Sequence, residues 1–127
     1  MHLARKAREN LDAAARLLPG EDGDYFANAS ASRSYYAAYL ATAHRALALG
    51  LDFTARAGTH FTHDSLPGDP ARLGILDDQD TDDLILLRDR RVKADYYEDD
   101  VDLDEATQAH ELASRLVGTL LGGEHTE

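Results

Sequence analysis

The residues with the clearest chemical potential lie in segment 84–97, which reads LILLRDRRVKADYY. A helix turns about 100° per residue, so it would place Arg88, Arg91 and Asp95 on one strip with Leu84. Apolar side chains flank this strip on both sides. An ion buried among apolar groups is costly unless it is paired and hydrogen-bonded. The spacing therefore predicts either a tight internal network of charges or a cleft that uses them.

Arg91 and Asp95 have the residue types and the spacing for phosphate chemistry. An arginine presents a planar fork of N–H donors that suits a phosphate, and Asp95, one helical turn later, can hold this fork by an i,i+4 pair. His44 or His110 could supply a titrating group from another helix, because histidine titrates near neutral pH. The candidate catalytic residues are Arg91, Asp95 and His44.

A second interpretation gives the same charges a structural role. Arg33 lies on the apolar face of its own predicted helix, as His44 does, and could join Arg91 and Asp95 in an ion-pair network that fixes helix register. The sequence leaves both interpretations open. On either one, three charged side chains of segment 84–97 are expected to face water: Asp89, Arg90 and Lys93.

The candidate binding residues combine aromatic groups with arginines: Arg33, Tyr36, Arg88 and Tyr96. Tyr36 belongs with Tyr35 and Tyr39 to one helical stripe. Such tyrosines stack on bases in proteins that bind single-stranded nucleic acid, and they also pack in cores and dimer interfaces.

Signals for a metal ion are weak. His60 and His63 have the spacing of two ligands on one helical turn, but the sequence offers no evident third ligand nearby. The acidic runs 77–83 and 98–105 have the alternating aspartates of calcium loops without the glycine that makes their turn. We therefore predict no metal and no cofactor, and interpret the acidic runs as solvated helix starts.

A bundle of helices is expected to position these residues. Apolar periodicity predicts four long helices, at residues 3–18, 24–49, 80–97 and 102–121, and a short helix at 70–76. Residues 51–69 have the composition of a loop, and Asp102 with Glu105 has the spacing of a capping box. No segment alternates like a strand. The expected fold class is all-α, an up-and-down four-helix bundle with an extra short helix, in a single domain over residues 1–127.

Composition narrows the functions further. The 127 residues carry a formal net charge of −11, which opposes non-specific binding to nucleic acid but permits a local basic cleft. The absence of cysteine excludes disulfides and thiolate chemistry. There is no apolar run of about 20 residues for a membrane span and no signal-peptide core, so we expect a cytoplasmic protein without a membrane partner.

Three segments together resemble the HEPN family (higher eukaryotes and prokaryotes nucleotide-binding). SRSYYAAY at 32–39, continuing into AHRAL at 43–47, resembles the long second helix of these domains. RVKADY at 91–96 resembles the Arg-x-x-Ala-Asp-Tyr signature of one bacterial and archaeal branch, and DEA at 104–106 fits the start of a final alanine-rich helix. The resemblance spans about residues 7–121.

This resemblance implies a small all-α domain, usually a homodimer, that acts on or near RNA as a toxin–antitoxin or defence component. Catalytic relatives cleave RNA without metal, using an arginine followed after four to six residues by a histidine. Neither Arg88 nor Arg91 has a histidine at that spacing. The resemblance also implies an alternative, a non-catalytic module that pairs with a nucleotidyltransferase or another partner. In paired relatives a tyrosine near the arginine motif accepts a nucleotide, a role that Tyr96 or Tyr97 could take.

Overall fold

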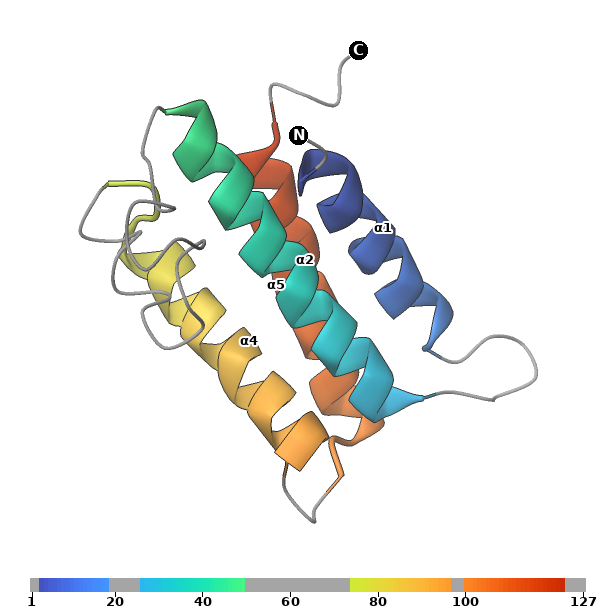
Figure 1. Cartoon of the computed structure of the whole chain (residues 1–127). Helices are drawn as coiled ribbons and strands as arrows, with labels where there is room; N and C mark the ends of the chain where they lie inside the picture. Colours follow the sequence, from blue (N-terminus) through green and yellow to red (C-terminus); the bar gives the residue numbers. More distant parts are fainter. Residues whose placement is uncertain (1–2, 19–25, 50–73, 97–99, 123–127) are drawn as a thin grey trace.

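Four helices make up most of what the computed structural model describes, which is residues 3–18, 26–49, 74–96 and 100–122 (Figure 1). They are α1 (Leu3–Arg16), α2 (Ala27–Ala48), α4 (Asp78–Tyr96) and α5 (Leu103–Leu120). Successive helices run in opposite directions along the bundle, and the described residues contain no strand. The all-α, up-and-down prediction is therefore confirmed for these residues.

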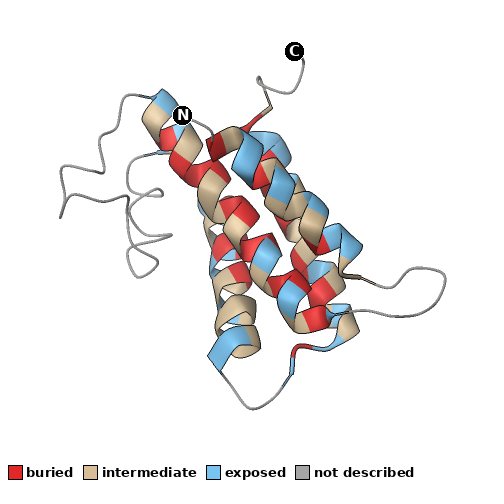
Figure 2. Cartoon of the chain, turned by 45° about the vertical axis from the view of Figure 1, so that its right-hand side comes forward, coloured by how far each residue is buried: buried red, intermediate tan, exposed pale blue. Residues whose placement is uncertain are grey.

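Helix α2 packs more extensively than any other described helix, and it does so against α1, α4 and α5. Its buried residues are mostly alanines and serines, and they lie around much of its circumference (Figure 2). Such small side chains allow neighbouring helices to approach closely. Tyr35 is the largest side chain of α2 that is fully buried, and it packs in the core with Leu84, Leu87 and Leu116.

Aspartates begin both of the last two helices, as the acidic runs predicted. Asp102 accepts a hydrogen bond from the Glu105 amide at 2.7 Å, and the Glu105 side chain accepts one from the Asp102 amide at 3.1 Å. This confirms the predicted capping box. Asp77 accepts the amide of Asp80 at 2.7 Å, which satisfies one of the free N–H groups at the start of α4.

The predicted short helix at 70–76 is not formed in its described part. Residues 74–76 make a turn before α4, in which Gly74 has a φ of 80°, a value that favours glycine. Residues 70–73 lie outside the described residues, as does the predicted loop at 51–69.

The buried face of α4 is also rotated from the predicted one. Its buried residues are Asp80, Asp83, Leu84 and Leu87, while Ile85 keeps an exposed fraction of 39%. Helix α4 packs mainly against α2 and α5 among the described elements. The strip of Arg88, Arg91 and Asp95 therefore lies at the edge of the α2–α4 contact instead of in the middle of a buried face.

Candidate functional site

Helices α2 and α4 meet through six side chains that we call the Arg91 cluster: Ser32, Tyr35, Tyr36, Arg91, Asp95 and Tyr96. Ser32 and Tyr36 are one turn apart on α2, and Arg91 and Asp95 are one turn apart on α4. Because the two helices run in opposite directions (Figure 1), Ser32 faces Asp95 and Tyr36 faces Arg91.

The guanidinium of Arg91 is held on several sides. Its Nη2 donates to the hydroxyl of Tyr36 at 3.1 Å and to that of Tyr96 at 3.4 Å. Its Nε lies 3.1 Å from Asp95 Oδ2 in an orientation that makes an ion pair without a hydrogen bond. The Arg91 side chain keeps an exposed fraction of only 14%. The i,i+4 pair of Arg91 and Asp95 is thus confirmed.

Ser32 is the member of the cluster that sequence reasoning missed. Its hydroxyl lies 2.8 Å from one carboxylate oxygen of Asp95 and 3.0 Å from the other. Asp95 therefore receives a hydrogen bond from α2 while it pairs with Arg91 within α4. The only indication in the sequence that Ser32 belongs to this cluster is its position one helical turn before Tyr36.

Three tyrosine rings surround the same guanidinium. The Cζ atom of Arg91 lies 5.9, 5.6 and 5.3 Å from the ring centres of Tyr35, Tyr36 and Tyr96. These distances are within the range of cation–π attraction. Tyr35 and Tyr36 also pack edge to face, with ring centres 5.5 Å apart. Tyr96 is the exposed wall of this enclosure, with an exposed fraction of 69%.

Burial and charge shift the pKa values of the cluster. Burial raises the pKa of the Tyr35 phenol well above its ordinary value, although the positive charge of Arg91 opposes this. Burial also raises the pKa of Tyr39. For Arg91 burial acts to lower the pKa, but the hydrogen bond to Tyr36 and the nearby Asp95 outweigh it, so the pKa is raised. The guanidinium is therefore a permanent cation beside the neutral phenol of Tyr35.

The other predicted site residues lie apart from this cluster or at its edge. Arg33 is exposed and donates to Asn10 of α1 at 3.2 Å, so it does not join the predicted network with Arg91 and Asp95. Arg88 is half-buried, and its charge acts on Tyr35. The reason that Arg33 is separated is that its side of α2 faces α1 and not α4.

Neither candidate histidine is one of the six side chains of the Arg91 cluster. His44 is half-buried on α2, eight residues after Tyr36, which is about 12 Å further along the helix. His110 is half-buried on α5. The structure therefore brings Arg91 and Asp95 together with Tyr36 and Tyr96, and not with His44. His60, His63 and Tyr97 lie outside the described residues.

Two charges that were expected to face water instead join α4 to α5. Lys93 Nζ lies 2.9 Å from Glu105 Oε1, and Arg90 Nε lies 3.6 Å from Glu105 Oε2. The hydrogen bonds from Lys93 and from the backbone of Asp102 lower the pKa of Glu105. The prediction was wrong for Arg90 and Lys93 because α5 covers that side of α4; Asp89 is exposed as predicted.

A second unpredicted group of charges closes the other end of the same interface. Arg115 of α5 lies 2.9 Å from Asp80 Oδ1 and also contacts the carboxylate of Asp83. Both aspartates are buried, and Gln79 donates to Asp83 at 3.1 Å. The acidic start of α4 is therefore only partly solvated, because two of its aspartates form ion pairs with α5.

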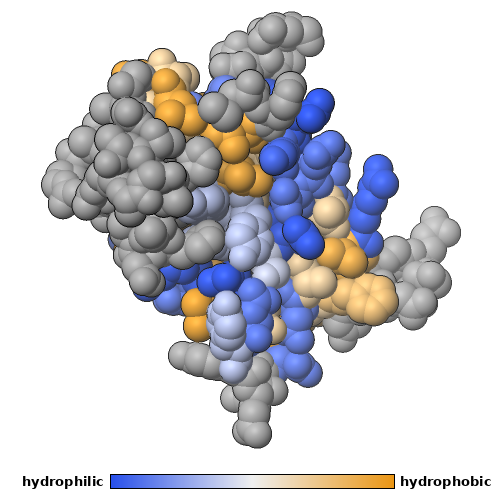
Figure 3. Space-filling model, in the orientation of Figure 1, coloured by the Kyte–Doolittle hydropathy of each residue, from blue (hydrophilic) through white to orange (hydrophobic). Residues whose placement is uncertain are grey.

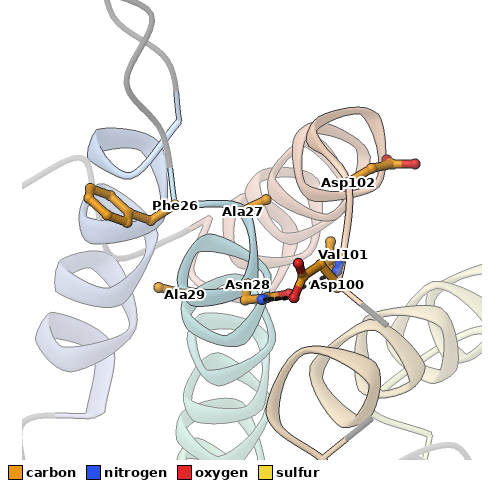
Figure 4. A pocket seen from close by; sticks show the side chains of 7 residues that line it. All are labelled: Phe26, Ala27, Asn28, Ala29, Asp100, Val101 and Asp102. Carbon is orange, nitrogen blue, oxygen red and sulfur yellow. Dashed lines mark hydrogen bonds between the residues drawn. The ribbon is translucent and has the colours of Figure 1, made fainter. Parts of the chain in front are cut away.

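A surface pocket of about 510 Å³ lies where α2 begins, at the end of the molecule that carries the α4–α5 connection (Figure 4). Its lining residues are Phe26, Ala27, Asn28, Ala29, Asp100, Val101 and Asp102. Asn28 donates to Asp100 at 3.0 Å and accepts from the Val101 amide at 2.8 Å. This pocket is separate from the Arg91 cluster in its lining residues.

The described residues contain neither a candidate metal site nor a membrane-spanning helix. Among them, no group of three or more histidine, aspartate or glutamate side chains is placed to hold a metal ion. None of the described helices is long and apolar enough to span a membrane.

Comparison with known protein families matches this chain to the HEPN domain over residues 1–123. The chain therefore belongs to the HEPN family, as the resemblance indicated, and the four antiparallel helices are consistent with that fold. No curated protein and no solved structure matches the chain. The narrower Arg-x-x-Ala-Asp-Tyr branch stays a prediction.

Proposed function

We propose that this HEPN domain is a non-catalytic module that binds a partner protein in a toxin–antitoxin or defence pair. The observation that carries the proposal is the occupancy of Arg91. Its guanidinium already has Asp95, two tyrosine hydroxyls and three ring faces within the same chain. An arginine so enclosed holds α2 against α4, and a phosphate would have to displace these contacts.

The partner class follows from the family resemblance. A nucleotidyltransferase and a second copy of this chain are the two candidates, and they are compatible with each other. The acidity of the chain, with a net charge of −11, favours a protein partner over an extended nucleic acid. On this proposal Arg91, Asp95 and Ser32 are structural, and the exposed surfaces of the bundle carry the function.

Metal-independent cleavage of RNA is the second candidate, and one observation favours it. Tyr96 is largely exposed, and its 3.4 Å contact is the longest that Arg91 donates. If Tyr96 moved away, the Nη2 edge of Arg91 would be open to a phosphate, with Tyr36 and Arg88 beside it and His44 further along α2. Cleavage would then need a histidine or another base to approach in a dimer.

An RNA-cleavage assay in EDTA distinguishes the two functions. The samples are wild-type protein, Arg91→Ala and, as a matched control, Arg33→Ala, each checked for helix content by circular dichroism. We expect no cleavage above buffer by any of them. Cleavage by wild type and Arg33→Ala, but not by a folded Arg91→Ala, would replace the proposed function with the ribonuclease.

A co-expression experiment tests the positive side of the proposal. Where a nucleotidyltransferase gene lies beside the gene of this protein, the two proteins are produced together, and the purified material is measured by light scattering. We expect a complex of defined stoichiometry that survives in Arg91→Lys, because that variant keeps a cation in the cluster. The proposed function would be contradicted if the wild-type protein stayed monomeric when purified alone and bound no partner in the co-expressed sample.

A further inference from the structure

Phe26 breaks two local rules at once. It occupies the N-cap position of α2, where serine, threonine, aspartate or asparagine would supply a side-chain acceptor, and α2 has no side-chain cap. It also leaves an aromatic ring exposed, with an exposed fraction of 64%. Residues that violate local rules without a gain in folding commonly serve a function.

The backbone of Phe26 is nevertheless fixed. Its amide donates to the carbonyl of Leu17 at 2.7 Å, and its carbonyl accepts from the Ser30 amide at 2.9 Å. The ring therefore projects from a held position at the point where α1 ends and α2 begins. Figure 3 shows apolar surface in the region where α2 begins, apart from a second apolar area towards the opposite end of the bundle.

The opposite wall of the same pocket is acidic and equally well held. Asn28 holds both Asp100 and the Val101 amide, and Figure 4 shows this pair between Phe26 on one side and Asp102 on the other. Within the described residues, one oxygen of each carboxylate, Oδ2, accepts no hydrogen bond. Both carboxylates can therefore accept hydrogen bonds from a ligand.

The charge of the pocket selects a cation. No lysine or arginine is among its lining residues. The positive ends of α2 and α5 amount to about half a charge each, which the carboxylates of Asp100 and Asp102 together outweigh. A cation would thus find a negative field, and the alanines, Val101 and Phe26 would contact the apolar part of the same ligand.

We infer that this pocket binds an arginine side chain in a basic segment of a partner protein. The methylene stem of an arginine packs on apolar surface while its guanidinium reaches carboxylates. The volume of about 510 Å³ is large enough for one such side chain with its neighbouring backbone. This inference rests on the proposed function only in that the occupant belongs to a protein.

The test uses fluorescence anisotropy with the full-length protein and three labelled peptides. The probes are acetyl-Gly-Arg-Gly-Arg-Gly amide, the same peptide with lysine, and the same peptide with citrulline, which has the shape of arginine without its charge. We expect the arginine peptide to bind at least fivefold more tightly than the citrulline peptide, and more tightly than the lysine peptide.

Phe26→Ser is the decisive variant, because it removes the ring and supplies the missing N-cap acceptor. We expect its melting temperature to rise while its affinity for the arginine peptide falls about fivefold. Asp100→Asn is expected to weaken binding by a similar factor. Asp89→Asn, which makes the same change in charge on an exposed part of α4, is the matched control and is expected to bind like wild type.

Equal binding of the arginine and citrulline peptides would overturn the inference, and so would unchanged binding in Phe26→Ser. A fall in Asp89→Asn as large as in Asp100→Asn would also overturn it, because net charge alone would then explain the attraction. These failures are separate from a failure of the proposed function, which the RNA assay and the co-expression experiment measure without any peptide.

Discussion

The hydroxyl of Ser32 lies within 3.0 Å of both carboxylate oxygens of Asp95, so a residue of α2 orients the acid that neutralises Arg91 on α4. The ion pair of Arg91 and Asp95 therefore connects α4 to α2, although both of its members belong to α4. It also means that removing Arg91 leaves Asp95, whose side chain is partly buried, without its cation.

Arg91→Ala is expected to lower the free energy of unfolding by about 1–3 kcal/mol. The variant removes a cation from beside Asp95 and the hydrogen bonds to Tyr36 and Tyr96. Urea unfolding followed by circular dichroism measures the change. Arg33→Ala, which removes an exposed arginine, is the control and should stay within about 0.5 kcal/mol of wild type. A loss in Arg91→Ala no larger than in the control would mean that the cluster does not hold the helices together.

The contact between Ser32 and Asp95 can be measured by a double-mutant cycle. Ser32→Ala, Asp95→Asn and the double variant are unfolded in urea under the same conditions. We expect a coupling energy of about 1 kcal/mol, since the bond involves a charged acceptor that is partly exposed. Additive effects of the two substitutions would show that the contact between Ser32 and Asp95 does not contribute to the free energy of unfolding.

Arg115→Ala is expected to be more costly than its own exposed position suggests. It would leave Asp80 and Asp83, both buried, without their cation. Removing one partner of a buried ion pair commonly costs about 3–5 kcal/mol, and we expect the lower end here because Arg115 is partly solvated. The melting temperature is the readout. Recovery of that temperature in the triple variant Asp80→Asn, Asp83→Asn, Arg115→Ala would confirm that unpaired carboxylates cause the loss.

Glu105 gives the bundle a dependence on acidic pH. Lys93 lowers the pKa of Glu105 in the folded state, so its contribution is present above the ordinary pKa of a glutamate. The contribution is lost as the pH falls through the lowered folded value. We therefore expect the stability difference between wild type and Glu105→Gln to be largest near pH 7 and to shrink towards pH 3. A difference that stays constant over this range would contradict the ion pair with Lys93.

Tyr35 gives a dependence on alkaline pH with the opposite sign. Burial raises the pKa of its phenol, so its contribution to stability is full below the ordinary tyrosine pKa of 10 and is lost as the pH rises towards the folded value. We expect wild type to unfold on alkaline titration and Tyr35→Phe to tolerate a higher pH. Absorbance at 295 nm, which reports tyrosinate, should show one fewer late-titrating group in the variant.

The features that the sequence predicts correctly depend on short stretches of chain. The capping box of Asp102 and Glu105 and the pair of Arg91 and Asp95 each lie within one helical turn, where spacing alone sets the geometry. The helices themselves follow from apolar periodicity. The family was reached from three short motifs, and the comparison over residues 1–123 confirms it.

The features that were missed depend on which helix covers which side of another. Periodicity gives the angle of Lys93 and Arg90 around α4, but it does not tell that α5 lies on that side. The same limitation applies to Arg115, which is 35 residues from Asp80, and to Ser32, which is 63 residues from Asp95. Phe26 was placed inside a predicted helix because its pattern continues that of α2, whereas its backbone has left the helical range.

Because α2 contacts α1, α4 and α5 together, insertions and deletions within it are constrained as strongly as substitutions of its buried side chains. One residue inserted between Ser32 and Tyr36 would turn everything beyond it by about 100° and shift it by about 1.5 Å. That single change would misalign three interfaces at once, and it would separate Ser32 from Tyr36 in register. Natural variation in this protein should therefore take the form of substitutions within α2, while insertions and deletions collect in the connections between helices.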